Sequence, residues 1–444
     1  MSDMNRRGAL RSLALVAAGA ALGVIVAVSG SHPVTAVQRA ARQSWGEILI
    51  VGDENGQGQP SRYFAELYDP LTNRFVSPPP VMLEGRIGAA AMLIKNGPNA
   101  GKVLVTGGIN RESGALKRSE LYDPSDSTFS MGPNLSADFY SQPAIEISNG
   151  KMAGWFLLAN AYPSALYDPV ANHFSAGPEM ICSQPLYTAT PIPSGQEQGK
   201  ILFAGGDFVP RANQKTGCSS SNATELFDPA VNEFEPGPRM NSGRWGGTAT
   251  VLRSGPNAGK IFLAGGYSGH LEPGEYPVAL VPLASTEIYD PATNTFVPPS
   301  KTPTLITPRA DHTATLITLG PNAGKILIAG GQQGGRTTLS STELYDPESN
   351  RFAAGPNLLS ARTQHIAIAI PFGPEAGKIL IAAGVLKDEY DWNQCFEVNL
   401  CPSTALDSTE LYDPIANRFI PGPRMHGAPG QAVAIQLPAA PPGP

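Results

Sequence analysis

The sequence is poor in the residues from which catalytic and metal sites are most often built. It contains 6 histidines and 4 cysteines among 444 residues, and charged residues make up 15% of the chain. The histidines show no H-x3-H or H-E-x-x-H spacing, so nothing supports the chemistry of a zinc peptidase. The sequence has no G-x-S-x-G segment either, so a hydrolase nucleophile elbow is unsupported.

The chain also lacks an excess of positive charge. Its formal net charge is −6, and residues 37–444 carry 28 basic and 36 acidic side chains. A protein that binds nucleic acid through phosphate contacts needs a basic surface, so we expect no nucleic-acid partner.

The N-terminal residues have the pattern of a targeting segment. Arg6, Arg7 and Arg11 precede an apolar run from Leu13 to Val28. A positively charged stretch followed by an apolar one is typical of export signals. We therefore expect residues 1–36 to be a signal peptide or an N-terminal membrane anchor, by the Sec or the twin-arginine route. The predicted location is outside the cytoplasm, as a secreted, periplasmic or membrane-anchored protein.

Glycine and proline are abundant, with 48 and 43 copies, and yet 41% of the residues are hydrophobic. Disordered chains rich in turn residues have fewer apolar residues than this. The combination indicates many short strands joined by tight turns.

One short motif occurs seven times. It reads hydrophobic-aromatic-Asp-Pro and continues into x-x-N-x-F, with Ser127 as the one substitute for Asn. Asp bonds the backbone two residues on, Pro fixes φ at the first turn position, and Asn tolerates the left-handed conformation. Each copy therefore predicts a hairpin. The copies begin at Glu66, Glu120, Ala165, Glu225, Glu287, Glu343 and Glu410.

A second pattern precedes the motif in each repeat. It is a short, wholly apolar strand that ends on glycine, as in Lys260–Gly266 and Lys325–Gly331. A strand that is apolar on both faces is predicted to be buried on both sides. A further strand comes before it, as in residues 246–252 and 313–318.

Four strands per repeat, a double glycine after the second strand and the Tyr-Asp-Pro of the third together resemble the kelch repeat. The resemblance covers residues 47–437 and implies an all-β fold, a seven-bladed kelch-type β-propeller with four antiparallel strands per blade. The fourth strand here opens with Phe where the family usually has Trp. The third repeat has Ala159-Asn160 in place of the double glycine.

Counting strands predicts how the ring closes. No innermost strand precedes Ile48, and a surplus strand, residues 430–437, follows the last motif. The C-terminal strand should therefore complete blade one, which removes an exposed edge. Residues 37–46 are expected to be a linker and 438–444 a Pro-rich tail.

The kelch scaffold also occurs in copper-radical oxidases that resemble galactose oxidase. Those need an adjacent Tyr-His pair, which this sequence lacks, so we expect no metal and no cofactor. The segment Gly-Pro-Asn-Ala-Gly-Lys has glycines and a lysine, but it differs from a phosphate loop in spacing. Its repetition favours a hairpin turn, at residues 97–102, 255–260 and 320–325.

Arginine and histidine recur just before the innermost strands. The arginines resemble the family's structural arginine, and the alternative is a cationic ring that recognises an acidic ligand. The histidines either have similar structural roles or meet at a shared mouth. The residues are Arg86, Arg244, Arg309, Arg362, Arg424, His312, His365 and His426.

The four cysteines fall in connections that a kelch blade places on one face. The predicted disulfides are Cys182–Cys218 and Cys395–Cys401, which suits an oxidising compartment.

Loop lengths indicate where a partner binds. From each motif aromatic to the end of the next second strand there are 38 to 42 residues, whereas from there to the next aromatic there are 7 to 28. Variation confined to one face of a repeat array is typical of a binding surface. The predicted ligand-binding residues are Tyr267, His270, Tyr276, Arg309, Asp311, His312, Tyr390, Trp392 and Phe396.

The sequence favours a monomeric binding or scaffolding module for a protein or carbohydrate partner. Two alternatives stay open: an extracytoplasmic propeller enzyme, oxidase- or lyase-like, with an unassigned site at the central mouth, and a structural surface component. Whether the protein is an enzyme is uncertain from the sequence, which favours a binding role.

Overall fold

The structure, a computed structural model, divides the chain into two compact units, Met1–Arg42 and Gln43–Pro444. It describes residues 46–54, 65–110, 113–139, 144–159, 164–181, 187–206, 222–268, 281–334, 337–386 and 404–439. Among these residues, no helix combines the length and the apolar character needed to cross a membrane.

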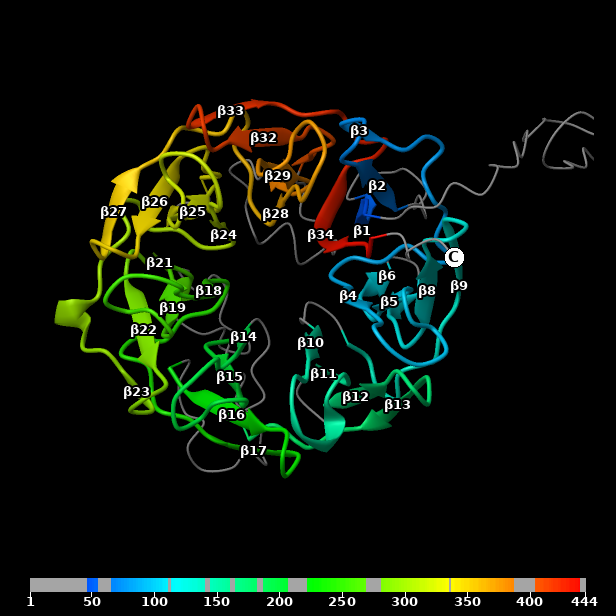
Figure 1. The fold of residues 1–444 in the computed structure, drawn as a ribbon, viewed down its shortest axis with the longest axis horizontal. Helices are drawn as coiled ribbons and strands as arrows, with labels where there is room; N and C mark the ends of the chain where they lie inside the picture. The colour runs from blue at the N-terminus through cyan, green and yellow to red at the C-terminus, as the bar shows by residue number, and fades with distance from the viewer. Residues whose placement is uncertain are drawn as a thin grey trace, which may run out of the picture. The chain divides into compact units, whose positions relative to one another are not determined.

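The described part of the second unit is a seven-bladed β-propeller (Figure 1). Each blade is a four-stranded antiparallel sheet, and its strands follow one another outward from the centre of the ring. The predicted fold class is therefore confirmed.

We number the blades along the chain. Blade 1 has the order β34 (Pro429–Gln436), β1 (Ile48–Glu54), β2 (Glu66–Asp69) and β3 (Arg74–Phe75). Blades 2 and 3 are formed by β4 (Ala90–Leu93), β5 (Val103–Thr106), β8 (Ser119–Asp123), β9 (Thr128–Met131), β10 (Ala144–Glu146), β11 (Phe156–Leu158), β12 (Ala165–Asp168) and β13 (His173–Ala176). Blades 4 and 5 are formed by β14 (Thr188–Pro191), β15 (Ile201–Ala204), β16 (Thr224–Asp228), β17 (Glu233–Pro236), β18 (Thr248–Val251), β19 (Ile261–Ala264), β22 (Thr286–Asp290) and β23 (Thr295–Phe296). Blades 6 and 7 are formed by β24 (Thr313–Leu316), β25 (Ile326–Ala329), β26 (Thr342–Asp346), β27 (Arg351–Ala354), β28 (Ile366–Ala369), β29 (Ile379–Ala382), β32 (Glu410–Asp413) and β33 (Arg418–Pro421).

The hydrophobic core lies between the blades. Seven apolar clusters are found among the described residues, and each joins one blade to the next around the ring. In the cluster between blades 5 and 6, for example, Phe262 of β19 stacks on Tyr345 of β26 with ring centroids 4.2 Å apart. The apolar second strands are buried along their whole length, as their sequences predicted.

The Tyr-Asp-Pro motif forms the predicted hairpin between the third and fourth strands. In blade 1 the Tyr68 hydroxyl donates to Asn73 Oδ1 at 3.0 Å, and Asp69 Oδ1 accepts the backbone N–H of Leu71 at 2.9 Å. Asn73 has a φ of 51°, in the left-handed region, and the equivalent residue of every other blade is left-handed too. One asparagine thus reverses the chain and fixes the tyrosine against the next strand.

The ring closes as the strand count predicted. Strand β34 pairs antiparallel with β1, with Ile48 opposite Gln436 and Val51 opposite Val433. The two ends of the unit are therefore held in one sheet, and blade 1 has an innermost strand like the others.

The Gly-Pro-Asn-Ala-Gly-Lys segments are turns between the first and second strands. The first glycine of each lies against the Asp-Pro turn of the next blade. A Cβ on Gly320 would be 2.2 Å from the carbonyl oxygen of Pro414, and Gly97 and Gly255 are equally close to their prolines. The segment is a joint between blades.

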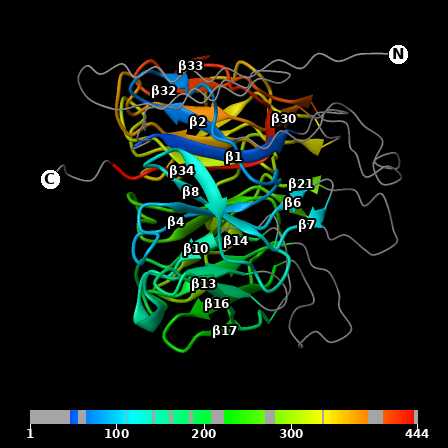
Figure 2. The ribbon, with the colours of Figure 1, turned by 90° about the vertical axis from the view of Figure 1, so that its right-hand side faces the viewer.

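Three further two-stranded sheets occur in the described loops between second and third strands. They are β6 (Ile109–Asn110) with β7 (Gly114–Ala115), β20 (Tyr267–Ser268) with β21 (Val281–Pro282), and β30 (Val385–Leu386) with β31 (Thr404–Ala405). Figure 2 shows β6, β7, β21 and β30 on the same side of the ring. We call this side, formed by the loops between strands two and three and by the connections between blades, the loop face.

Removing the closing strand should open the ring. Deletion of residues 428–444 takes away β34 and exposes the edge of β1, so we expect loss of cooperative thermal unfolding and aggregation through that edge. Circular dichroism melts and size-exclusion chromatography measure both effects. Deletion of residues 440–444 is the control and should change neither. A chain without β34 that melts like the full-length protein would contradict this closure.

The turn glycines allow a matched test of the joint between blades. Gly320 and Gly324 lie in the same turn with φ values of 76° and 87°, but a Cβ on Gly324 meets nothing within 4 Å. Gly324→Ala should cost about 1–2 kcal/mol of unfolding free energy, for the left-handed backbone alone. Gly320→Ala should cost about 1–3 kcal/mol more, because the methyl group collides with Pro414. Equal losses in urea denaturation would show that the contact contributes nothing.

Candidate functional site

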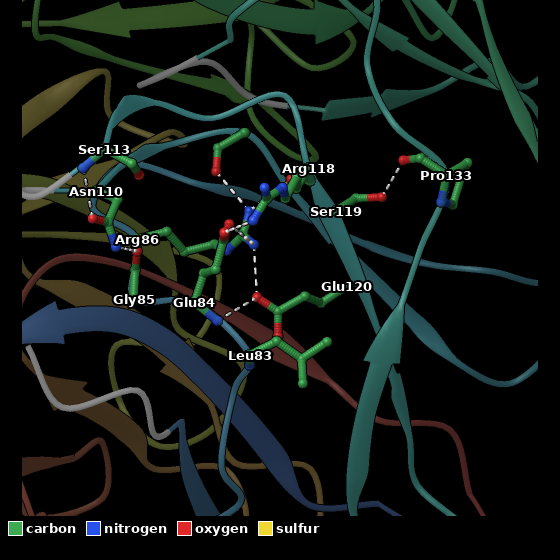
Figure 3. A network of polar contacts seen from close by, with 11 residues as sticks. Leu83, Glu84, Gly85, Arg86, Asn110, Ser113, Arg118, Ser119, Glu120 and Pro133 are labelled. Carbon is green, nitrogen blue, oxygen red and sulfur yellow. Dashed lines mark hydrogen bonds and ion pairs between the residues drawn. The ribbon is translucent and has the colours of Figure 1, made fainter.

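Buried arginines organise the loop face. In blade 2 the Arg86 guanidinium is fully buried and donates to the carbonyls of Gly107 and Arg118 at 2.9 and 3.0 Å (Figure 3). It also forms an ion pair with Glu120 of β8, with 2.6 Å between Nη2 and Oε1. The same pair recurs in blades 5, 6 and 7, as Arg244–Glu287, Arg309–Glu343 and Arg362–Glu410.

The glutamate of each pair also accepts hydrogen bonds from backbone N–H groups. In blade 6 its two oxygens accept the backbone N–H groups of Ile306 and Thr307 at 2.7 and 2.9 Å. These residues belong to the connection from blade 5, so Glu343 fixes the path by which the chain enters its own blade. Burial lowers the pKa of Arg309, and the charge of Glu343 acts in the opposite direction.

The backbone at the arginine joins neighbouring blades. Gly266, the second glycine after β19, donates its N–H to the carbonyl of Arg309 at 2.9 Å. A Cβ on Gly265 would be 2.3 Å from the same oxygen. The double glycine is therefore required by the close approach of the next blade's backbone.

Blades 1, 3 and 4 depart from this pattern. Blade 4 keeps the buried glutamate, Glu225, but has no arginine in the sequence before its innermost strand. In blade 3 Phe139 replaces the arginine and Ala165 replaces the glutamate, and both are buried. In blade 1 Glu66 pairs with His426, at 3.0 Å from Nδ1. Arg424, which the sequence grouped with the structural arginines, is mostly exposed and pairs with Asp407 at 3.2 Å. The grouping is therefore wrong for Arg424.

Two histidines lie in the joints between blades. His312 Nε2 is 3.1 Å from Thr248 Oγ1 of blade 5, and His365 Nε2 is 3.0 Å from Thr313 Oγ1 of blade 6. Both are buried, and burial lowers the pKa of each to about 3, with Arg309 acting in the same direction on His312. Both are therefore neutral at pH 7, and each bonds a threonine of the preceding blade.

Backbone hydrogen bonds link neighbouring blades near the centre of the loop face, across blades 5, 6 and 7 and between blades 1 and 2. Asp311 N–H donates to the Gly246 carbonyl at 2.8 Å, Gln364 N–H to the Asp311 carbonyl at 3.0 Å, and Gly88 N–H to the Gln431 carbonyl at 3.3 Å. All five residues have positive φ, although three of them are not glycine. We call the site formed by these five residues the mouth. Non-glycine residues in this conformation cost about 1–3 kcal/mol each and often mark ligand sites.

An aromatic pair stands beside the mouth in blade 5. Trp245 and Tyr267 have ring centroids 4.5 Å apart, and the Tyr267 hydroxyl donates to Gln332 Oε1 at 2.7 Å. The same hydroxyl is 3.4 Å from Asp311 Oδ2. Tyr267 is buried and Trp245 partly exposed, so the tryptophan is the outer member of the pair.

The structure brings four of the predicted ligand-binding residues together: Tyr267, Arg309, Asp311 and His312. Arg309 and His312 are occupied in the joints, which leaves Asp311 at the mouth with Tyr267 behind it. Their roles in binding stay predictions. The other predicted residues lie outside the described part of the chain, namely His270, Tyr276, Tyr390, Trp392, Phe396 and the cysteines Cys182, Cys218, Cys395 and Cys401.

The sequence analysis did not single out Trp245, Gln332 or Gln364. Trp245 and Gln364 lie one and two residues after the recurring arginine, so the register of the repeat places both near the mouth. No sequence signal distinguishes Gln332, which becomes relevant through its contact with Tyr267.

The opposite face has a pocket of about 410 Å³ between blades 3 and 4. It is lined by Ser148, Asn149, Pro191, Ile192, Pro193, Gln198 and Gly199. None of these side chains titrates, so the pocket provides no general acid or base. Within the described residues, no group of three or more His, Cys, Asp or Glu side chains could hold a metal ion.

Fold and site together define a β-propeller whose blades are joined by glycine–arginine contacts on the loop face and by glycine–proline contacts on the opposite face. The model of the Kelch motif matches residues 322–359, which include β25, β26 and β27 of blade 6. A comparison with curated protein sequences finds no significant match. The chain therefore combines a match to the Kelch motif in blade 6 with a seven-bladed propeller, a fold that suggests a protein-interaction module.

The joint histidines should make stability depend on pH. The folded state keeps both neutral down to about pH 3, whereas the unfolded chain protonates them near pH 6.5. Their contribution is therefore complete above pH 6.5 and falls, with a slope of up to about 1.4 kcal/mol per pH unit for each, as the pH drops toward 3. Urea denaturation between pH 7.5 and 4.5 measures the loss.

The double variant His312→Gln/His365→Gln should flatten that profile. His173→Gln, at an exposed position of β13, is the control and should leave it unchanged. A double variant with the pH dependence of the original protein would contradict the assignment.

Proposed function

We propose that this protein is an exported binding module whose partner, a protein or a carbohydrate, docks on the loop face. The observation that carries the proposal is the difference between the two faces of the ring. On the opposite face the turns pack against the next blade, whereas the loop face carries the three extra two-stranded sheets of the described residues.

The opposite face is constant because its turns pack on one another. Gly195, Gly255 and Gly373 would each place a Cβ within 2.3 Å of a proline carbonyl in the next blade. An insertion in one of these turns would separate two blades, which explains why their lengths barely vary.

The loop face varies because its loops project away from the joints. The three extra two-stranded sheets emerge there (Figure 2). They expose aliphatic side chains, with Ile109 of β6 at 38% and Val281 of β21 at 54%. Exposed apolar side chains on variable loops, set on a rigid ring, suit recognition of a partner.

The chemistry of the mouth favours binding over catalysis. A propeller enzyme would bring titratable groups to the centre. Arg309 and His312 are instead held in the blade interior by Glu343 and Thr248. These contacts account for the positions of both residues, so a catalytic role is not needed to explain them.

Export rests on the N-terminal pattern of Arg6 and Arg7 before the apolar run Leu13–Val28. Fractionation of the cells that produce the protein tests this part separately. Full-length or shortened chain outside the cytoplasm supports export, and chain confined to the cytoplasm would refute it.

Site-specific photo-crosslinking tests the binding face in those same cells. A crosslinking residue at Ile109 or Val281 should capture one defined species, identified by mass spectrometry. The matched controls are Val170 and Val231, both 63% exposed on the opposite face, which should capture none.

The identified species then permits a quantitative measurement. Ile109→Glu and Val281→Glu should weaken its binding at least tenfold, without a shift in melting temperature, because both side chains are exposed. Capture from the opposite face alone, or full affinity in both variants, would refute the proposed docking face.

A further inference from the structure

The charges at the mouth restrict what it can bind. The four described arginines beside it, Arg86, Arg244, Arg309 and Arg362, are each buried and paired with a glutamate. No guanidinium of these four is directed to an incoming anion. A cationic ring that recognises an acidic ligand is therefore excluded for these residues.

Two uncommitted amides lie on the mouth. Gln364 and Gln431 are partly exposed and have positive φ, and within the described residues their side chains make no hydrogen bond. An amide offers two donors and two acceptor lone pairs without a charge. At the position that Asp311 occupies in blade 6, blades 7 and 1 thus have the uncharged amides of Gln364 and Gln431.

The positions of these groups are fixed by the backbone. Asp311 is bonded to Gly246 on one side and to Gln364 on the other. Trp245 precedes Gly246 directly in the chain, so an aromatic ring, a carboxylate and an amide follow one another over blades 5, 6 and 7. Gly246 leaves room for this arrangement, since a Cβ there would be 2.8 Å from Asp311 Oδ1.

The aromatic ring is supported from behind. Tyr267 is buried against Trp245 and is held by its hydrogen bond to Gln332. Trp245 is partly exposed, and the face of an aromatic ring has a negative electrostatic potential that attracts the C–H bonds of a saturated ring.

We propose that Asp311, Gln364 and Gln431 of the mouth form, together with the adjacent Trp245, a binding subsite for a neutral saccharide. A pyranose has one face rich in C–H bonds and a rim of hydroxyl groups. The C–H face suits packing against the ring of Trp245. The hydroxyl groups suit amides, which both donate and accept hydrogen bonds. A basic peptide is disfavoured because only one of the three polar positions is acidic.

This inference rests on the proposed function, since it places the saccharide on the same face as the partner. The saccharide subsite and the proposed docking residues differ in location. The subsite lies at the centre of the face, whereas Ile109 and Val281 lie on the projecting sheets. Variants of the two regions therefore separate the two claims.

The experiment uses the full chain on an array of neutral saccharides that contain glucose, galactose, mannose, xylose and N-acetylglucosamine units. The strongest binder is then titrated by calorimetry. Gln364→Ala should weaken its binding at least tenfold and leave the melting temperature unchanged, because the side chain makes no hydrogen bond with the described residues. Trp245→Ala should abolish binding, with folding checked by circular dichroism.

The matched control is Gln198→Ala, at an exposed position on the opposite face, which should bind like the original protein. Ile109→Glu should also keep the saccharide, even where it loses the crosslinked partner. An array without a binder, full affinity in Gln364→Ala, or a lysine-rich peptide bound at the mouth in place of any saccharide would overturn the subsite. None of these results would alter the crosslinking outcome.

Discussion

The close approach of one blade's double glycine to the next blade's arginine carbonyl determines most of this structure. Gly266 donates to the Arg309 carbonyl at 2.9 Å, and Gly265 has no room for a side chain beside the same oxygen. The Arg309 side chain then turns back to its own second strand and donates to Gly330 at 2.8 Å. Each repeat is thus attached to the previous one by its backbone and to itself by its guanidinium. Joints of this kind recur around the ring in the blades that keep the arginine, and the apolar clusters fill the space between blades.

The same arrangement explains why one face of the ring is variable. On the opposite face, turn glycines contact proline carbonyls of the next blade, so both partners have a fixed length and shape. On the loop face the joint is made at the end of the second strand, before the loop to the third strand begins. A loop such as that between β19 and β22 can therefore lengthen without moving a joint, and this freedom makes the loop face suitable for evolving a binding surface.

Much of the fold could be predicted because the repeat encodes local physics. Asn73 takes a left-handed φ, and Asp69 bonds the backbone two residues on, whatever the blade that contains them. The apolar strand Ile326–Ala329 is buried on both faces because it lies between neighbouring sheets. Closure by β34 followed from counting strands alone. These are properties of single repeats, and the sequence displays them seven times.

The mouth could not be predicted in the same way, since it is built from single residues of several blades. Trp245, Asp311 and Gln364 are more than fifty residues apart from one to the next, and only the ring makes them neighbours. Arg424 shows the opposite error: its position in the sequence resembles that of the structural arginines, but His426 forms the pair with Glu66.

Blade 3 shows what the buried ion pair requires. It lacks the arginine and the glutamate together, with Phe139 and Ala165 in their places, and it also lacks the double glycine. Blade 3 has lost both charges together, so neither is left buried without its partner. Phe139 keeps the backbone role, since its carbonyl still accepts the N–H of Gly108 at 2.7 Å. Blade 3 thus keeps the backbone contact between blades. Apolar packing takes the place of the ion pair there.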